Sequence, residues 1–300
     1  MFLNFIDIGV ELRIENPDIR KFFEYKYVNQ ISHCKFETCI QIIELHDSKL
    51  YSITQSSLEN ITSNNFMGTD IAYNDKKIIF FSNDVRTGVI QQVSLYLSFI
   101  MQIVLSYHNI YLLHGACIVD NNQGIIIIGN SGAGKSSILL REITEYNKKM
   151  ITDDILILTI INAQIIAVKN IHSIGINEED LNRYYPYLKP FRDISQKDNY
   201  QIKSRINYEK YDNSVYVDKI GVKKIIFLCE RQAKPTIKKI DASKAFKYLV
   251  NSHRHYFKGV IDFFDIFTHL VHTCDCYQLN ICIDIEETIN ILNSVLNNEE

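Results

Sequence analysis

Residues 129–136 read GNSGAGKS and match the phosphate-binding pattern G-x-x-x-x-G-K-[ST]. Glycines in such a loop let successive backbone N–H groups converge on phosphate oxygens, and the helix that follows adds the positive end of its dipole. Lys135 supplies a positive charge, and the hydroxyl of Ser136 can bind magnesium. The pattern predicts a nucleoside triphosphate site. Kinases, ATPases, GTPases and transporters all share it, so other residues must decide the reaction.

The flanking residues support this prediction. An apolar run at residues 125–128 is typical of a strand, and SSILLREI after the lysine is typical of a helix. The alternative interpretation, a glycine-rich turn without a ligand, does not require this order of strand, loop and helix. The residues expected to bind the nucleotide are Gly129, Asn130, Ser131, Gly132, Ala133, Gly134, Lys135, Ser136 and Ser137.

Two adjacent carboxylates, Asp153 and Asp154, follow the strand-like residues MIT and precede the apolar ILIL. At a strand end that faces phosphates, a carboxylate can hold magnesium directly or through water. Two of them allow one to bind the metal while the other accepts the proton of an attacking hydroxyl, as a kinase requires. The alternative is an aspartate pair that only forms a turn or caps a helix.

Upstream, His114 and Gly115 lie in an apolar run that we expect to form one strand at residues 111–119. A single histidine on a strand is usually structural. Here its surroundings matter, because LLHGACIVDNNQGIIIIGNSGAGKSSILLREI followed by MITDD closely resembles the catalytic domain of the HPr kinase/phosphorylase family. These bacterial enzymes phosphorylate a serine on a small phosphocarrier protein. The resemblance is good over residues 112–175 and holds only in outline beyond them.

The resemblance implies an α/β fold, with a P-loop domain of the PEP carboxykinase/HPr kinase-like type that has a mixed sheet. It implies ATP and Mg²⁺ as cofactors. By position it places His114 near the phosphates, Lys135 on the β and γ phosphates and Ser136 on magnesium. It makes Asp153 the base that accepts the serine proton, with Asp154 supporting the metal or the base.

The chain departs from the family at residues 170–175. Where the family has E-x-R-G-L-G, with a metal-binding glutamate and an arginine, this chain reads NIHSIG. The departure puts phosphorolysis in doubt and leaves magnesium more dependent on Ser136 and the aspartates. Glu178 and Glu179 are the candidates to replace the missing acid.

The residues before position 89 do not resemble the regulatory domain of the full-length enzyme. The chain is more similar to divergent HPr-kinase-like proteins, some of which resemble kinases that phosphorylate a serine of a ribosomally made precursor peptide. We therefore expect a peptide or small protein as the acceptor and partner. A small-molecule hydroxyl kinase and a nucleotide-binding regulator without transfer activity are the alternatives.

Phosphoryl transfer usually needs a cation beyond the loop lysine. The candidates are Arg141, Arg231 and Arg254. Arg141 is expected to point into solvent from the helix after the loop, and Arg254 sits in a His-Arg-His cluster typical of a solvated helix end. Arg231 ends a predicted strand, and strand ends in such sheets face the ligand crevice, so Arg231 is favoured as a catalytic residue.

Composition limits the class of protein. The chain has 300 residues, 46% of them hydrophobic, and a formal net charge of −3, which gives no general attraction to nucleic acid or anionic lipid. No apolar stretch is long enough to span a membrane, and the first residues lack the features of a secretion signal. The seven cysteines suggest reduced thiols and a cytoplasmic protein. A metal cluster at His272, Cys274 and Cys276 is the less favoured reading of a strand-like segment.

The elements that must position these residues follow from hydrophobic periodicity. We expect a small β-rich N-terminal domain (1–88), a connecting helix (89–109) and the P-loop catalytic domain (110–300). A turn at residues 121–124 should make an antiparallel hairpin, so the loop strand belongs to a mixed sheet. Homo-oligomers are common in the family that the chain resembles.

The remaining elements are less distinctive. The tyrosine-rich segment 177–219 is expected to be irregular and exposed. Further expected elements are strands at 224–229 and 277–283 and helices at 243–250, 259–271 and 286–296.

Overall fold

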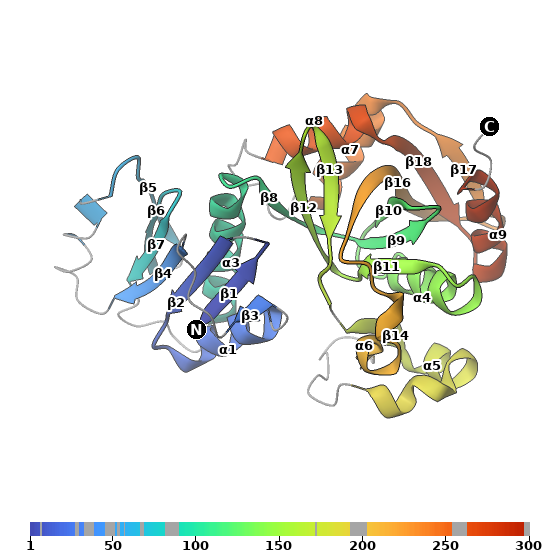
Figure 1. Cartoon of the computed structure of the whole chain (residues 1–300), viewed down its shortest axis with the longest axis horizontal. Helices are drawn as coiled ribbons and strands as arrows, with labels where there is room; N and C mark the ends of the chain where they lie inside the picture. The colour runs from blue at the N-terminus through green and yellow to red at the C-terminus, as the bar shows by residue number, and fades with distance from the viewer. Residues whose placement is uncertain are drawn as a thin grey trace. The chain divides into compact units, whose positions relative to one another are not determined.

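The computed structural model describes residues 1–6, 8–27, 30–32, 39–45, 52, 55–56, 58–66, 69–81, 90–171, 173–192, 203–253 and 263–296. The chain divides into two compact units, Met1–Tyr111 and Leu112–Glu300 (Figure 1). Within the described ranges, every helix is too short or too polar to span a membrane.

The first unit contains a seven-stranded sheet in the order β3-β1-β2-β4-β7-β6-β5. Its strands are β1 (Phe2–Phe5), β2 (Ile8–Arg13), β3 (Ile31–Ser32), β4 (Cys39–Leu45), β5 (Thr62–Phe66), β6 (Thr69–Tyr73) and β7 (Lys77–Phe81). Helix α3 (Ile90–Ser106), which the sequence predicted, packs on β6, β7 and α1 (Pro17–Lys26) and is grouped with this unit. The predicted limits of the N-terminal domain and the connecting helix stay a prediction.

Helix α1 was not predicted, although its start is legible in the sequence. The side chain of Asn16 accepts hydrogen bonds from the backbone N–H groups of Asp18 and Ile19, and Pro17 occupies the first turn. An asparagine cap followed by proline is a typical helix start.

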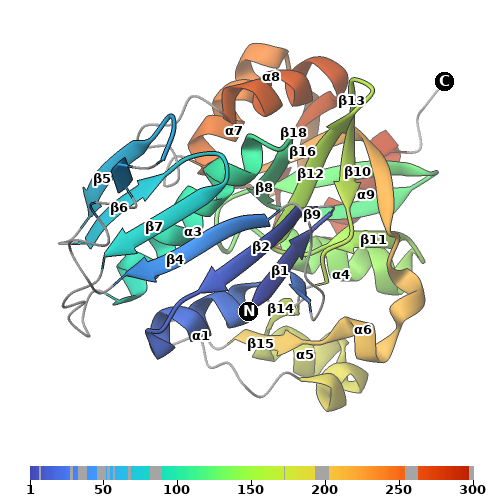
Figure 2. The same cartoon turned by 60° about the vertical axis from the view of Figure 1, so that its left-hand side comes forward.

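The second unit is built on a mixed sheet whose central order is β11-β9-β10-β16-β18-β17. These strands are β9 (Ala116–Asp120), β10 (Gln123–Ile128), β11 (Lys149–Thr152), β16 (Lys219–Arg231), β17 (Thr236–Lys239) and β18 (Asp275–Ile281). The N-terminal end of β16 also pairs with β13 (Gln164–Val168), which continues the sheet through β12 (Ile155–Ile161) to β8 (Ile110–His114). Strands β14 (Ile174–Asn177) and β15 (Lys203–Ile206) form a separate ribbon (Figure 2).

The predicted hairpin and mixed sheet are both present. Strand β10 pairs antiparallel with β9 and parallel with β16. The turn between β9 and β10 consists of Asn121 and Asn122, whose φ angles are 47° and 60°. Asparagine tolerates this left-handed conformation better than most residues, so the turn residues fix the hairpin and its register.

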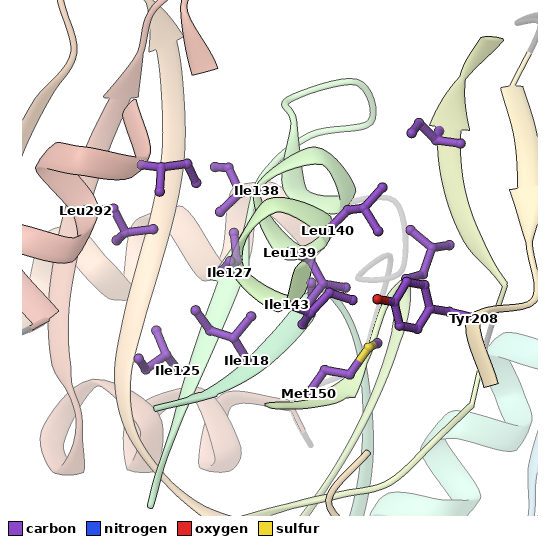
Figure 3. Packing of buried hydrophobic residues seen from close by; sticks show 14 of the residues in the cluster. Ile118, Ile125, Ile127, Ile138, Leu139, Leu140, Ile143, Met150, Tyr208 and Leu292 are labelled. Atoms are coloured by element: carbon purple, nitrogen blue, oxygen red, sulfur yellow. The ribbon is translucent and has the colours of Figure 1, made fainter. Parts of the chain in front are cut away.

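Helices cover both faces of this sheet (Figure 1). α4 (Lys135–Glu145) and α9 (Ile285–Leu296) share one hydrophobic core with β9, β10, β16 and β18. On the other face lie α7 (Ala242–His253) and α8 (Phe263–Thr273), and the Phe227 ring of β16 contacts Tyr248 of α7. In Figure 3, Ile138 and Ile143 of α4 lie beside Ile118 and Ile127 of the hairpin. Fully burying each such side chain contributes about 1.5–3 kcal/mol, which fixes α4 and its first turn against the sheet.

Two sequence predictions in this unit are corrected by the structure. The described residues of segment 177–219, namely 177–192 and 203–219, form helical turns and strands rather than irregular structure. Tyr184, Tyr187 and Tyr211 are exposed as expected, but Tyr185 and Tyr208 are only 5% and 3% exposed and join the core beside α4. Aromatic rings bury large areas, and this stabilises local helical turns. These are α5 (Glu178–Tyr184), α6 (Tyr208–Tyr211) and the 3₁₀ turns η3 (Pro186–Phe191) and η4 (Asn213–Val215).

The run at 111–119 is also not one strand. It breaks at Gly115 into β8 and β9, which occupy different places in the sheet. The Gly115 N–H donates to the carbonyl of Asp154 (3.0 Å). A Cβ at this position would lie 3.0 Å from the carbonyl oxygen of Ile127, so a larger residue would press on this backbone and glycine is favoured.

Candidate active site

The loop between β10 and α4, residues 129–134, has the backbone conformation that its glycines permit. Gly132 and Gly134 have φ angles of +79° and +97°, which other residues rarely adopt. Gly134 is the N-cap residue of α4 and, as a glycine, has no side chain that could cap the helix. The first N–H groups of a helix have no partner within it and point toward its start, so the beginning of α4 is suited to bind an anion.

The loop is packed tightly against the sheet. A Cβ on Gly129 would lie 3.0 Å from Leu228 Cβ of β16 and 3.1 Å from Ala133 Cβ. The side chain of Lys135 is buried at the base of the loop, where Nζ donates to the carbonyls of Gly129 (2.8 Å) and Asn130 (3.2 Å). The loop therefore holds its own ammonium group in place beside the start of α4.

Strand directions bring the two aspartates to the same edge as the loop. Strand β9 is antiparallel to both β10 and β11, so β10 and β11 run in the same direction. Their carboxyl ends, where the loop and Asp153 begin, consequently share one edge of the sheet. The next residue, Asp154, has a φ of 83°, an uncommon conformation that turns the chain sharply at this point.

Asp153 is the most deeply buried carboxylate of the site, at 1% exposed. Burial raises its pKa to about 6, and the nearby charge of Asp154 acts in the same direction. Hydrogen bonding by Ser136, the charge of Lys135 and the backbone N–H of Gly175 oppose the rise. Within the described part of the chain, the Asp153 Oδ1 atom has no hydrogen-bond partner. A buried carboxylate with a raised pKa and an unpaired oxygen is typical of a functional site.

This pKa predicts how stability depends on pH. In the unfolded chain Asp153 loses its proton near the ordinary value of 3.8, whereas in the folded chain it keeps the proton up to about pH 6. The folded state therefore binds more protons between these values, and the contribution of Asp153 to stability falls as pH rises from about 4 to about 6. The difference corresponds to about 3 kcal/mol. Urea unfolding of wild type and Asp153→Asn across this range measures it, and parallel pH curves for the two proteins would contradict it.

Asp154 contacts a different set of side chains. Its Oδ1 lies 2.9 Å from His114 Nδ1, and its Oδ2 lies 3.7 Å from Arg205 Nη1. Together with the bond from Gly115 to the Asp154 carbonyl, these contacts join the His-Gly pair to the aspartate turn. The structure thus brings together His114, Lys135, Ser136, Asp153 and Asp154, although their catalytic and metal-binding roles stay predictions.

Of the three arginines considered from the sequence, the structure describes Arg141 and Arg231. Arg231 is exposed at the end of β16, beyond Leu228, which packs against the loop. Arg141 does not point into solvent as expected: it is 12% exposed, lies 4.9 Å from the Tyr184 ring and pairs with Glu145. Arg254 lies outside the described residues. Arg205, which reaches the site through β15, gave no local signal in the sequence.

The residues considered for metal binding have other partners. Glu178 pairs with Arg192 and accepts a hydrogen bond from Ser204 (2.6 Å), and the Ser204 contact lowers its pKa. Asn170, the first residue of the NIHSIG segment, is 2% exposed and donates to the Ile155 carbonyl (2.7 Å). Glu179 is exposed. In the described ranges, no three His, Cys, Asp or Glu side chains, including those near Cys274, gather as ligands of a metal ion.

Comparison with known proteins shows a distant similarity of fold. No protein-family model matches the chain, and no curated protein sequence matches it. Among solved structures, the chain is similar to the Hpr(Ser) kinase/phosphatase from Coxiella burnetii, with 12% sequence identity over 62% of this chain and 95% of that chain. The TM-score of 0.36 marks a distant relationship of fold. The function must therefore be argued from the residues of the site.

Proposed function

We propose that this protein is an ATP-dependent kinase that phosphorylates a hydroxyl group, a serine of a peptide or small protein. The observation that carries the proposal is the environment of Asp153. A buried carboxylate whose pKa is raised to about 6 lies beside the serine and lysine of a phosphate-binding loop. A hydroxyl kinase needs these same components: a cradle for phosphates and a positioned acceptor for the hydroxyl proton.

The donor set of the site fits magnesium. Mg²⁺ prefers hard oxygen ligands and is usually bound through one or two protein oxygens together with substrate phosphates. The Ser136 hydroxyl and the adjacent aspartates offer such oxygens, and the unpaired Oδ1 of Asp153 is consistent with this use. When bound, magnesium neutralises the charge that develops on the transferring phosphoryl group.

In the proposed reaction, the first N–H groups of α4 and the ammonium of Lys135 hold the β and γ phosphates. Asp153 accepts the proton of the acceptor hydroxyl as the oxygen attacks the γ phosphorus. The new bond joins that oxygen to phosphorus, and the bond to the oxygen between the β and γ phosphates breaks, leaving ADP. His114, held by Asp154, is proposed to lie near the phosphates.

Transfer from γ-labelled ATP and Mg²⁺ tests the proposal. The purified chain is incubated with a set of serine-containing peptides, with small hydroxyl metabolites and alone. Label on a peptide supports the proposed function, whereas label on a metabolite selects the small-molecule kinase. Nucleotide binding without any transfer selects the regulator. No nucleotide binding overturns all three.

A further inference from the structure

The side chain of Arg205 lies at the proposed active site, although it belongs to a separate ribbon. Its Nη1 atom is 3.7 Å from Asp154 Oδ2 and donates to the carbonyl of Ser173 (3.5 Å). The side chain is 24% exposed, so it is anchored on the protein without being fully buried. This arrangement contrasts with that of Arg231, which is exposed at the end of β16.

Gly175 connects Arg205 to the proposed base. Strands β14 and β15 pair so that Gly175 is directly opposite Arg205. A Cβ on Gly175 would lie 3.7 Å from Arg205 Nη1 and 3.9 Å from Cζ, so the guanidinium lies over the face of this residue. The backbone N–H of the same Gly175 forms a hydrogen bond that lowers the pKa of Asp153. One glycine therefore separates the guanidinium from the carboxylate beside Ser136.

The two aspartates have different surroundings. Asp153 is buried among Ser136, Lys135 and Gly175, whereas Asp154 faces His114 with one oxygen and Arg205 with the other. At about 3–4 Å, an oxygen facing a guanidinium orients it electrostatically. A guanidinium offers several N–H donors in a fixed plane, so Arg205 can face Asp154 with one edge and a phosphate oxygen with another.

We propose that Arg205 is the cation that stabilises the transferring phosphoryl group, and that Asp154 is a positioning residue which orients Arg205 and His114. The inference rests on the proposed kinase function and supplies its missing cation. The arginine reaches the site from β15, far along the chain from the loop. The competing explanation is purely structural: Arg205 neutralises Asp154 and ties the ribbon to the sheet.

The test compares Arg205→Lys with Arg231→Lys, the rival that the sequence favoured, and with the control Arg20→Lys, all in the full chain. Lysine keeps the charge but not the planar set of donors. For Arg205→Lys we expect kcat to fall about 10- to 1,000-fold, because an arginine at the transferring phosphoryl group is worth up to about 10³–10⁵ in rate. KM for ATP should stay within about twofold of wild type, and the urea midpoint should stay the same as that of wild type. Arg20→Lys, at an exposed arginine that pairs with Glu24, should leave kcat within about twofold.

A second readout does not need an acceptor. ADP with aluminium fluoride and Mg²⁺ mimics the phosphoryl group in transit, and the wild type should bind this combination more tightly than ADP alone. Arg205→Lys should lose that gain while its affinity for ADP alone stays unchanged. A structural role would instead move the urea midpoint and both affinities together.

The outcomes separate the inference from the function on which it rests. A wild-type chain that transfers no label overturns the kinase function and the role of Arg205 with it. An active wild type with an equally active Arg205→Lys overturns the role of Arg205 alone. A loss of activity caused by Arg231→Lys, with Arg205→Lys unaffected, returns the role to the arginine that the sequence favoured.

Discussion

Asp153→Asn is expected to lower the rate of phosphoryl transfer about 10²- to 10⁴-fold while ATP still binds. The substitution keeps the shape of the side chain and removes the oxygen that accepts the hydroxyl proton. Binding should survive because the N–H groups of α4 and the ammonium of Lys135 are unchanged. Single-turnover transfer and the Kd for ATP, measured on the same preparation, check both halves of the expectation.

The same variant should be more stable than the wild type at neutral pH. Above about pH 6 the wild type holds a buried negative charge next to Asp154, and the amide of asparagine removes it. The gain has an upper limit of about 3 kcal/mol, from the pKa difference. A substitution that removes activity and raises stability is the signature of a residue kept for function. In the wild type, the rate of transfer should rise with pH through about 6 and then level off.

Asp218→Asn is the matched control for this chemical change. Asp218 is 83% exposed and pairs with Lys169 on the surface, so its substitution should leave both transfer and stability nearly unchanged. An Asp153→Asn protein that transfers phosphate at the wild-type rate would remove Asp153 from the mechanism. Equal losses in the two variants would show that the change is not specific to the site.

The part of the site that could be predicted from the sequence is the part that local residues encode. The turn residues Asn121 and Asn122 set the hairpin, and the glycines at 132 and 134 set the left-handed positions of the loop. The hairpin sets β10 antiparallel to β9, and the antiparallel pairing of β11 with β9 then gives the loop and Asp153 a common edge.

What the sequence did not reveal depends on pairing between distant segments. Arg205 reaches the site only because β15 pairs with β14 in the register that sets it opposite Gly175. Gly115 breaks a continuous apolar run. The need for glycine comes from another strand, because a Cβ here would lie 3.0 Å from the carbonyl oxygen of Ile127. The tyrosines near position 185 looked like a polar surface because tyrosine is compatible with both environments, and only the presence of α4 decides their burial.

The largest expected effect on binding comes from Lys135→Ala. A phosphate held in the loop would lose its point-charge partner, and truncating one member of a desolvated charge pair typically costs about 2–5 kcal/mol. The Kd for ATP should therefore rise about 30- to 5,000-fold. The effect on ADP should be smaller, because the lysine is proposed to contact both the β and γ phosphates. Titration calorimetry with both nucleotides measures the difference.

The variant also removes the donor to two loop carbonyls, so binding must be separated from folding. Lys135→Ala leaves the carbonyls of Gly129 and Asn130 without their ammonium donor. If a buried acceptor finds no other donor, the free energy of unfolding falls by about 1–3 kcal/mol. The urea midpoint of the free protein reports this part. Lys169→Ala, which breaks only a surface ion pair, serves as the control and should change neither quantity. If Lys135→Ala binds ATP with unchanged affinity while its fold is intact, the loop is not the phosphate site, and the proposed roles of Asp153 and Arg205 lose the group on which they act.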